Sequence, residues 1–210
     1  MTREDIEKLQ QLVQYCFKHD GPYRLSSGKV SKYYYDGKLG TLHPPTAWLL
    51  GNVLLDVIAD LNSEAVGGLE VGAIPIADAV GIAAHLRGIY LPTFFVRKEA
   101  KAHGTKSRIS QSRFDDAPLL SSGRHVAIVD DVITTGESIQ DAIDVVKGLG
   151  CVVTAVIALV ERHESGGKAL RSQGFPVLPV FYTNEAGDLF INDEFVQRSV
   201  RSAKSGVLSR

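Results

Sequence analysis

The segment from residue 126 to residue 138 constrains the fold of this chain more than any other stretch. It begins with the apolar run Val-Ala-Ile-Val, which predicts a buried strand, and continues through Asp130 and Asp131 to Thr-Thr-Gly. Apolar residues then recur at helical spacing, at positions 139, 142, 143, 146 and 149. A strand, a short hydroxyl-bearing loop and a helix N-terminus together predict a cradle for a phosphate group.

The side chains of this segment suit a sugar phosphate. The hydroxyls of Thr134, Thr135 and Ser138 can bind an anion together with the free N–H groups of the helix N-terminus. Two adjacent carboxylates repel a phosphate, so they suit sugar hydroxyls, a bound Mg²⁺ or a developing cation instead. The alternative interpretation is an ordinary strand, turn and helix with capping acids and hydroxyls. The sequence has no Walker A motif, which excludes the usual P-loop.

Composition is typical of a soluble globular protein. Of the 210 residues, 44% are hydrophobic and 22% are charged, and the formal net charge is -1. A nearly neutral chain has no general attraction to nucleic acid or to an anionic membrane, so we expect neither as a partner. The two cysteines, Cys16 and Cys151, form no metal-binding pattern, which fits a reducing compartment. No signal peptide or membrane-spanning run is visible, so a cytoplasmic location is expected.

Strand and helix patterns alternate along the chain. Strand-like runs lie near residue 66 and at 90–96, 126–129, 151–160 and 177–182. Helical patterns lie between them, at 6–17, 44–61, 75–87 and 139–149 and after 166. This alternation predicts an α/β fold with a mostly parallel central sheet and helices on both faces.

The remaining segments predict less regular structure. Residues 23–36 predict a hairpin of a small accessory lobe, residues 97–122 a loop between two strands, and residues 193–210 a terminal helix or a frayed end. Ligands of open parallel sheets gather at the carboxyl ends of the strands. Four such ends carry polar candidates, namely 70–72, Arg97, the acid pair and Glu161 with Arg162.

The segment after residue 96 is strongly basic. Residues 97–108 contain five lysines or arginines, at 97, 98, 101, 106 and 108, together with Glu99 and His103. No apolar period occurs there, which predicts an exposed loop that can close over a polyanion. A solvated run of charges is the alternative. A nucleic-acid patch is disfavoured because no aromatic residue lies between the charges.

Two of these segments resemble the signatures of a known family. Asp-Asp-Val-Ile-Thr-Thr-Gly, at 130–136, is similar to the ribose-phosphate motif of the type I phosphoribosyltransferases, in the form found in orotate phosphoribosyltransferases. Arg-Lys-Glu-x-Lys-x-His-Gly, at 97–104, resembles the flexible catalytic loop of the same enzymes. The resemblance implies one domain over residues 1–210, with a hood contributed mainly by residues 1–45 and the C-terminal part.

The resemblance also implies a reaction. The 5-phosphoribosyl group would pass from phosphoribosyl diphosphate to orotate, giving orotidine 5′-phosphate and pyrophosphate in pyrimidine (UMP) biosynthesis. Mg²⁺ would be the cofactor, held mainly by the substrate rather than by protein ligands. The family resemblance further implies a homodimer, in which the basic loop reaches into the neighbouring site.

The family resemblance also implies site residues, both within the two motifs and in other segments. Catalytic roles are implied for Lys101, His103, Asp130 and Asp131. Binding of phosphoribosyl diphosphate is implied for those four and for Arg97, Lys98, Val132, Ile133, Thr134, Thr135, Gly136, Glu137 and Ser138. The expected pyrophosphate loop is Glu70, Val71 and Gly72, and the expected orotate contacts are Thr134, Arg162, Tyr34 and Tyr35.

Two other functions fit the same motifs. A purine phosphoribosyltransferase would use the same ribose-phosphate cradle with another base. A non-catalytic, nucleotide-sensing regulator of the same fold would bind phosphoribosyl diphosphate without turnover. Lys101 and His103 favour an enzyme, because a regulator of this fold often loses the loop residues.

Overall fold

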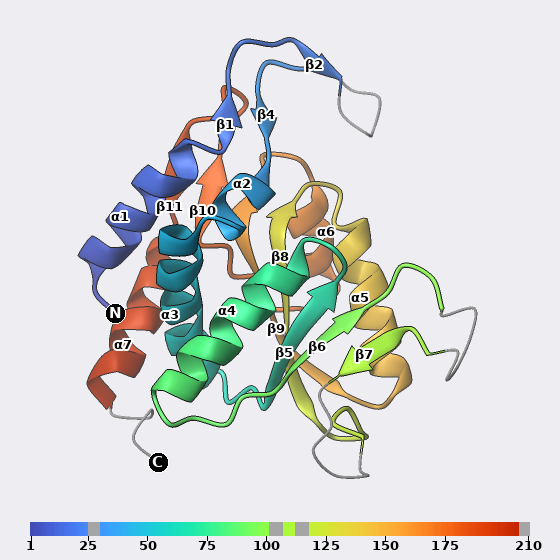
Figure 1. Ribbon diagram of the computed structural model, residues 1–210. Helices are drawn as coiled ribbons and strands as arrows, with labels where there is room; N and C mark the ends of the chain where they lie inside the picture. The colour runs from blue at the N-terminus through green and yellow to red at the C-terminus, as the bar shows by residue number, and fades with distance from the viewer. Residues whose placement is uncertain (25–29, 101–106, 112–117, 206–210) are drawn as a thin grey trace.

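A twisted, mostly parallel sheet forms the centre of the molecule (Figure 1). The computed structural model describes residues 1–24, 30–100, 107–111 and 118–205, the last four of these by their backbone alone. Within those residues the sheet has seven strands in the order β11-β10-β9-β8-β5-β6-β7. The five inner strands are parallel to one another, which confirms the predicted sheet; they are β5 (Ala65–Leu69), β6 (Thr93–Val96), β8 (His125–Ile133), β9 (Val152–Glu161) and β10 (Phe181–Thr183).

Helices cover both faces of this sheet, as the alternation predicts. On one face α3 (Pro44–Asp60) and α4 (Ala73–Leu86) pack together, and α1 (Arg3–Gln14) and α7 (Asp193–Ser205) lie against α3. On the other face lie α5 (Glu137–Gly148) and α6 (Gly166–Ser172). Strand alternation divides the core accordingly, because Ala127 and Val129 face the first group while Val126 and Ile128 face the second.

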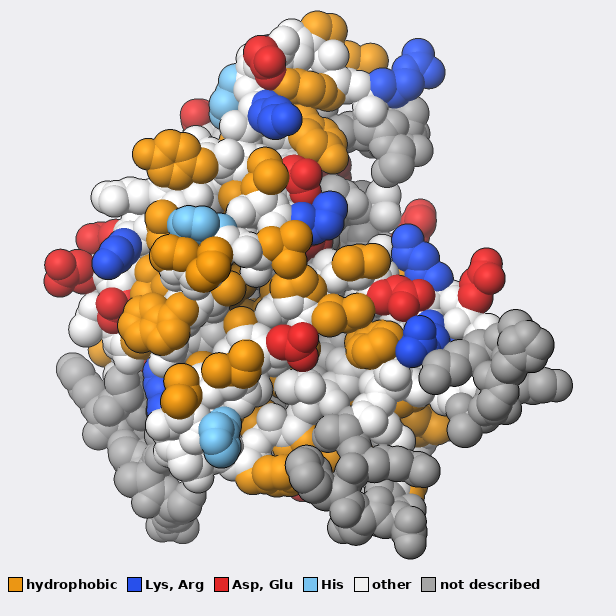
Figure 2. Space-filling model, viewed as in Figure 1, with side chains coloured by type: hydrophobic (Ala, Val, Ile, Leu, Met, Phe, Trp, Pro, Cys, Tyr) orange, Lys and Arg blue, Asp and Glu red, His pale blue; other side chains and the backbone are white. Residues whose placement is uncertain are grey.

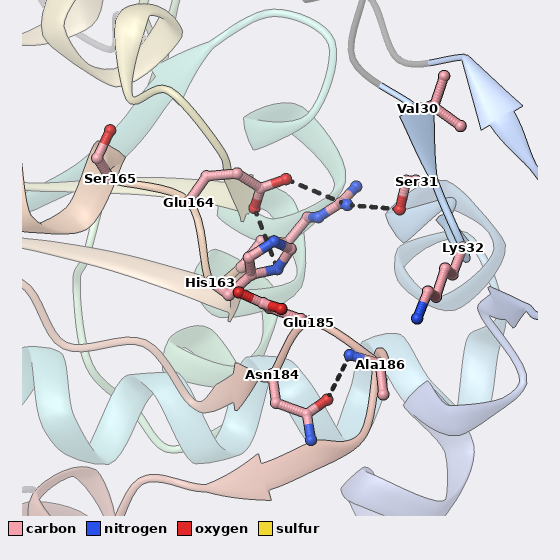
Figure 3. A pocket seen from close by; sticks show the side chains of 10 residues that line it. Val30, Ser31, Lys32, His163, Glu164, Ser165, Asn184, Glu185 and Ala186 are labelled. Carbon is pink, nitrogen blue, oxygen red and sulfur yellow. Dashed lines mark hydrogen bonds and ion pairs between the residues drawn. The ribbon is translucent and has the colours of Figure 1, made fainter.

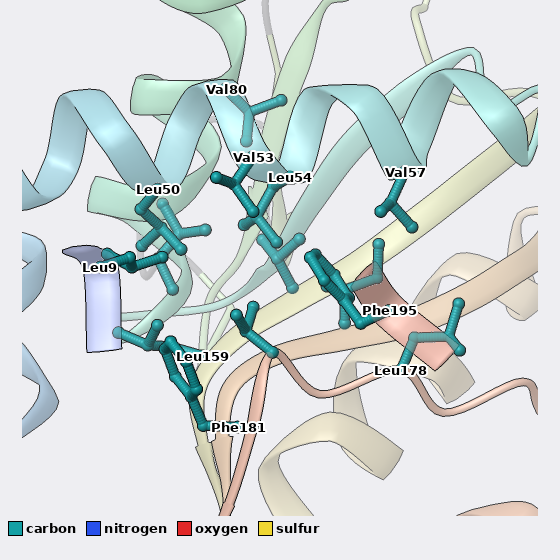
Figure 4. Packing of buried hydrophobic residues seen from close by; sticks show 14 of the residues in the cluster. Leu9, Leu50, Val53, Leu54, Val57, Val80, Leu159, Leu178, Phe181 and Phe195 are labelled. Carbon is teal, nitrogen blue, oxygen red and sulfur yellow. The ribbon is translucent and has the colours of Figure 1, made fainter. Parts of the chain in front are cut away.

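The first core contains the largest buried side chains. Phe195 of α7 and Phe181 of β10 are fully buried and pack with Leu50, Leu54 and Leu159 (Figure 4). The helix predicted at 44–61 is present as α3, and every residue from 49 to 58 is buried. The reason is that α3 lies between α1, α4 and α7, so it has no broad face toward water.

Local signals set several element boundaries. Thr2 and Asp5 form a capping box at the start of α1, and Pro44 begins α3. Leu149 is the C-cap of α5 and is 43% exposed, so it does not extend the buried face of that helix. Cys16 and Phe17 are buried beyond the end of α1 rather than within it.

The sheet differs from the sequence prediction in three places. Strand β8 does not end before the acid pair but continues to Ile133, because β9 pairs with it along this whole length. The predicted loop over 97–122 contains β7 (Ile109–Gln111), which pairs antiparallel with β6 at one edge. At the other edge β11 (Leu189–Ile191) pairs antiparallel with β10, although Val177–Tyr182 was the last strand predicted.

A small lobe lies beyond the carboxyl ends of the central strands (top of Figure 1). It contains the predicted hairpin, in which β2 (Tyr23–Arg24) pairs with β3 (Val30–Ser31). It also contains the pair of β1 (Phe17–Lys18) with β4 (Tyr34–Tyr35), followed by the short helix α2 (Gly37–Thr41). We refer to the described residues 17–24 and 30–41 as the hood. Among the described helices, none has the length and apolar character that crossing a membrane requires.

Candidate active site

The acid pair lies in the last part of β8, below the hood. Asp130 and Asp131 are both more than nine-tenths buried, and the backbone N–H of Asp131 donates to Asp130 Oδ1 at 2.9 Å. Burial raises the pKa of Asp130 well above its ordinary value, and the negative charge of Asp131 raises it further. Burial also raises the pKa of Asp131, while the ammonium of Lys38 opposes that shift. Such a pair is costly to fold, which points to a functional use.

Two glycines bring backbone directly against these carboxylates. A Cβ atom on Gly72, between β5 and α4, would lie 2.5 Å from Asp130 Oδ1 and 2.7 Å from Asp131 Oδ1. A Cβ atom on Gly37, at the start of α2, would lie 2.5 Å from Asp131 Oδ2. The backbone of the hood and that of the β5–α4 connection therefore both pack directly against the acid pair.

The loop after β8 has the geometry of an anion cradle. Gly136 adopts φ +82°, a left-handed conformation that favours glycine, and forms the N-cap of α5. The first turn of α5 presents N–H groups that lack partners within the helix. Thr134 and Ser138 both border the cavity that contains the acid pair.

Two cavities meet the carboxyl ends of the strands. The first, which we call the acid cavity, has a volume of about 400 Å³ and is lined by Lys38, Leu69, Glu70, Val71, Gly72, Lys98, Asp130, Asp131, Val132, Thr134 and Ser138. The second, which we call the arginine cavity, has a volume of about 830 Å³. It opens between the hood hairpin, the segment after β9 and residues 184–186 (Figure 3).

Arg162 is the central cation of the arginine cavity. It is only 4% exposed, and its Nη2 donates to Ser31 Oγ at 3.3 Å and lies 3.2 Å from Glu164 Oε1. Its guanidinium carbon lies 4.5 Å from the centre of the Tyr33 ring. Its Nε has no hydrogen-bond partner among the described residues, although it is buried. A buried guanidinium with an unused donor at a cavity wall is suited to a planar anionic ligand.

Comparison with known proteins identifies the family of this chain. Residues 48–173 match the phosphoribosyl transferase domain. An orotate phosphoribosyltransferase of Streptomyces coelicolor is 40% identical over 188 residues, which cover 89% of this chain and 99% of that protein. The chain belongs to the orotate phosphoribosyltransferase family. The family resemblance predicted from the two motifs is therefore confirmed.

Further members of the orotate phosphoribosyltransferase family are similar to this chain over most of its length, in sequence or in structure. The enzyme of Nostoc sp. is 39% identical over 173 residues, covering 82% of this chain and 80% of that protein. The Mycobacterium tuberculosis enzyme in complex with Fe(III) dicitrate superposes with a TM-score of 0.72 at 33% identity, over 88% of this chain and 99% of that one. A structure of the same enzyme with 5-phospho-alpha-D-ribosyl 1-diphosphate gives a TM-score of 0.68 at 29% identity, over 85% of this chain and 96% of that one.

Six of the thirteen residues predicted for phosphoribosyl diphosphate line the acid cavity, including Val132, whereas Ile133 is buried in the core on the side of α5. The acid cavity is lined by the acid pair, Thr134, Ser138 and residues 70–72. Lys98 also lines it, and the backbone N–H of Lys98 donates to Glu70 Oε1 at 3.0 Å. The peptide bond between Glu70 and Val71 is cis. Arg97 does not line this cavity; its Nη2 donates to Ser110 Oγ at 3.2 Å. Lys101 and His103 lie outside the described residues, so their catalytic roles stay predictions.

The residues predicted to contact orotate are more dispersed. Arg162 lines the arginine cavity and Thr134 the acid cavity, whereas Tyr34 and Tyr35 line neither. Tyr35 packs on Phe17 with ring centres 4.7 Å apart, and Tyr34 lies 5.6 Å from Tyr23. Burial, and then the charge of Asp131, raise the pKa of Tyr35 well above its ordinary value. Orotate binding by these two tyrosines stays a prediction.

Sequence reasoning missed three residues that border the cavities, His163, Glu164 and Lys38, and one buried residue beside them, Tyr33. Tyr33 stacks beneath Arg162, Glu164 pairs with it, His163 lies beside Glu164, and Lys38 lines the acid cavity. For Glu164 the signal was its position two residues after Arg162, directly beyond a strand end. Tyr33 and Lys38 gave no signal, because only the folding of the hood over the sheet brings them to the site.

Proposed function

We propose that this chain transfers the 5-phosphoribosyl group from phosphoribosyl diphosphate to orotate, giving orotidine 5′-phosphate and pyrophosphate. The observation that carries this proposal is the position of Arg162. Its buried guanidinium, with an unused Nε donor, follows the strand adjacent to the one that carries the acid pair. Orotate bears a carboxylate on a planar ring, which matches such a guanidinium far better than a neutral purine does.

The anion cradle would hold the 5′-phosphate of the ribose. The N-terminus of α5 and the hydroxyls of Thr134, Thr135 and Ser138 supply donors for one phosphate group. Asp130 and Asp131 would then accept hydrogen bonds from the ribose hydroxyls. The acid pair lines the same cavity as Thr134, Ser138 and residues 70–72, which supports a ribose held between the 5′-phosphate and the pyrophosphate.

The reaction needs positioning and charge more than a strong base. The orotate ring nitrogen, already acidic, gives its proton to the departing pyrophosphate and forms a bond to the ribose C1, while the bond from C1 to the pyrophosphate oxygen breaks and that oxygen retains the electron pair. The ribose gains positive charge as this bond lengthens, and the negative charge of the acid pair stabilises it. Lys98, and by family resemblance Arg97, Lys101 and His103, would neutralise the departing pyrophosphate.

Mg²⁺ fits the chemistry of the acid cavity. Asp130 and Asp131 are the hard oxygen donors that this ion prefers, and the described residues contain no group of three or more His, Cys, Asp or Glu placed to hold a metal. We therefore propose that the ion enters with the diphosphate and neutralises it, while the two carboxylates border it.

We also propose a homodimer in the cytoplasm. Large apolar side chains are exposed on α2, α3 and α4, where hydrophobic side chains gather on the face shown in Figure 2; they include Leu39, Leu42, Trp48, Ile82 and Leu86. Such a surface suits a second copy of this chain, which would bring its basic loop to the neighbouring site. The two buried free thiols fit a reducing compartment.

An ultraviolet assay with several bases tests the reaction. The protein is mixed with Mg²⁺, phosphoribosyl diphosphate and either orotate, hypoxanthine or adenine. We expect consumption of orotate alone, and we expect Arg162→Met to raise the KM for orotate while leaving that for phosphoribosyl diphosphate nearly unchanged. Turnover of a purine instead of orotate would refute the proposal, and binding of phosphoribosyl diphosphate without any turnover would favour a regulator.

Mixing two inactive variants tests the dimer. Asp131→Asn removes an acid of the site, and Lys101→Ala removes a residue of the loop. If the loop acts on the neighbouring site, each dimer that combines the two variants contains one intact site, and such dimers make up about half of an equal mixture, so about a quarter of the wild-type activity should return. If the mixture stays inactive while light scattering shows dimers, the loop serves its own subunit.

A further inference from the structure

Lys38 is a cation of the acid cavity that no sequence motif identifies. It is the second residue of α2, in the hood, whereas the other residues that line this cavity belong to the sheet and its connections. The hood thus contributes one side chain to the cavity that we assign to phosphoribosyl diphosphate. The role inferred below for Lys38 rests on that proposed function.

Charge in the acid cavity is unbalanced for an anionic ligand. Its described lining contains three carboxylates, those of Glu70, Asp130 and Asp131, but only two ammonium groups, those of Lys38 and Lys98. A diphosphate that enters this cavity adds several negative charges. Each described cation that can reach the ligand therefore has a large share in holding it.

Local structure fixes the backbone of Lys38 firmly. The carboxylate of Asp36 caps α2 by accepting the backbone N–H of Lys38 at 3.2 Å. Next to it, the backbone at Gly37 is so close to Asp131 that a Cβ atom there would lie 2.5 Å from Asp131 Oδ2. The root of the Lys38 side chain is therefore held against the acid pair.

The ammonium group, in contrast, is readily available. Lys38 Nζ lies 3.2 Å from Asp36 Oδ1, and its side chain is 52% exposed. An exposed ion pair of this kind is weak, because water screens it and the lysine side chain has many alternative rotamers. A polyanion in the cavity can compete with Asp36 for this ammonium group.

We propose that Lys38 binds the pyrophosphate group of phosphoribosyl diphosphate from the hood side, exchanging Asp36 for a phosphate oxygen. The hood then has a direct contact to the leaving group, in addition to its contacts around Arg162. Lys38 is thus a binding residue for the diphosphate and makes no contact with the base.

Calorimetric titration with pyrophosphate and Mg²⁺ tests this role. Lys38→Met should weaken pyrophosphate binding about tenfold. This is the lower end of what losing a charge-assisted hydrogen bond costs, because the Lys38 side chain is half exposed. Lys38→Arg should stay within about threefold of the wild type, because it keeps the charge. The matched control is Lys8→Met, which removes an exposed lysine of α1 away from both cavities and should bind pyrophosphate like the wild type.

Orotate binding separates this role from a change of fold. Titrated with orotate, Lys38→Met should behave as the wild type does, since Arg162 and its cavity are untouched. Pyrophosphate binding by Lys38→Met within twofold of the wild type would overturn the inference, and so would an equal loss of orotate binding. If the wild-type protein binds neither pyrophosphate nor phosphoribosyl diphosphate, the proposed function itself is wrong.

Discussion

The ion pair of Glu161 with Arg171 offers a prediction about how the orotate contact is held. Glu161 is the last residue of β9, directly before Arg162, and Arg171 belongs to α6. The two guanidinium nitrogens of Arg171 donate to the two carboxylate oxygens, each at 2.7 Å, and Nη2 also donates to the Val177 carbonyl at 3.1 Å. This bidentate pair ties the end of β9 to α6, so we predict that Arg171→Met destabilises the protein.

The burial of the two partners sets the magnitude. The side chain of Glu161 is 9% exposed, so removing Arg171 leaves a nearly buried carboxylate without its cation. Breaking a buried pair costs about 3–5 kcal/mol, but the side chain of Arg171 is 37% exposed and water can replace part of it. We therefore expect a loss of about 2–3 kcal/mol in the free energy of unfolding, or about 5–10 °C in Tm for a chain of this length.

Urea denaturation followed by circular dichroism measures this loss. The matched control is Arg124→Met. The side chain of Arg124 is 34% exposed, but that of its partner Glu64 is 49% exposed. This variant should therefore lose less than about 0.5 kcal/mol in free energy of unfolding. The double variant Glu161→Gln with Arg171→Met should be more stable than Arg171→Met alone, because no buried charge is left. Equal stabilities for Arg171→Met and the wild type would refute this reasoning, as would an unchanged KM for orotate in a destabilised variant.

Three further predictions concern the acid pair and the thiols. Asp130→Asn should abolish turnover yet stabilise the fold at pH 8. Because the pKa of Asp130 is raised in the folded protein, ionisation of this residue lowers the stability of the wild type as the pH rises above the ordinary aspartate pKa. In denaturation curves, the difference in free energy of unfolding between the variant and the wild type should therefore vanish below about pH 4. Gly72→Ala should reduce turnover strongly with a small change in Tm, since its Cβ would lie 2.5 Å from Asp130 Oδ1; normal kcat would contradict this. Burial raises the pKa of Cys16 to about 11, so this thiol should resist alkylation at pH 8 until the protein is unfolded, and rapid labelling of native protein would show otherwise.

Sequence reasoning gave the sheet and the anion cradle because both depend on local patterns. The apolar run before Asp130, the glycine at position 136 and the spacing of Ile139, Ala142, Ile143 and Val146 each report on near neighbours in the chain. The edge strands β7 and β11 were missed for the opposite reason. Each has three residues and forms only by pairing with a strand already in place, so its own sequence carries little periodicity.

The composition of the arginine cavity could not be read from the sequence. Arg162 was found because it follows a strand, but its partners Ser31 and Tyr33 are about 130 residues away and reach it only through the hood. Glu161 was a candidate because it lies at a strand end, and its ion pair with Arg171 favours a structural role. The contribution of residues 1–45 and of the C-terminal part to a hood, as the family resemblance implies it, and the orotate contacts of Tyr34 and Tyr35 stay predictions.

The continuation of β8 through the acid pair has a consequence for catalysis. Because the ladder between β8 and β9 extends to Ile133, the backbone of both aspartates is held by the sheet before any substrate arrives. Their negative field at the ribose is therefore preorganised, and little reorganisation energy is needed when charge develops on the sugar. The free energy for bringing two carboxylates together is supplied once, when the chain folds, and not again in each turnover.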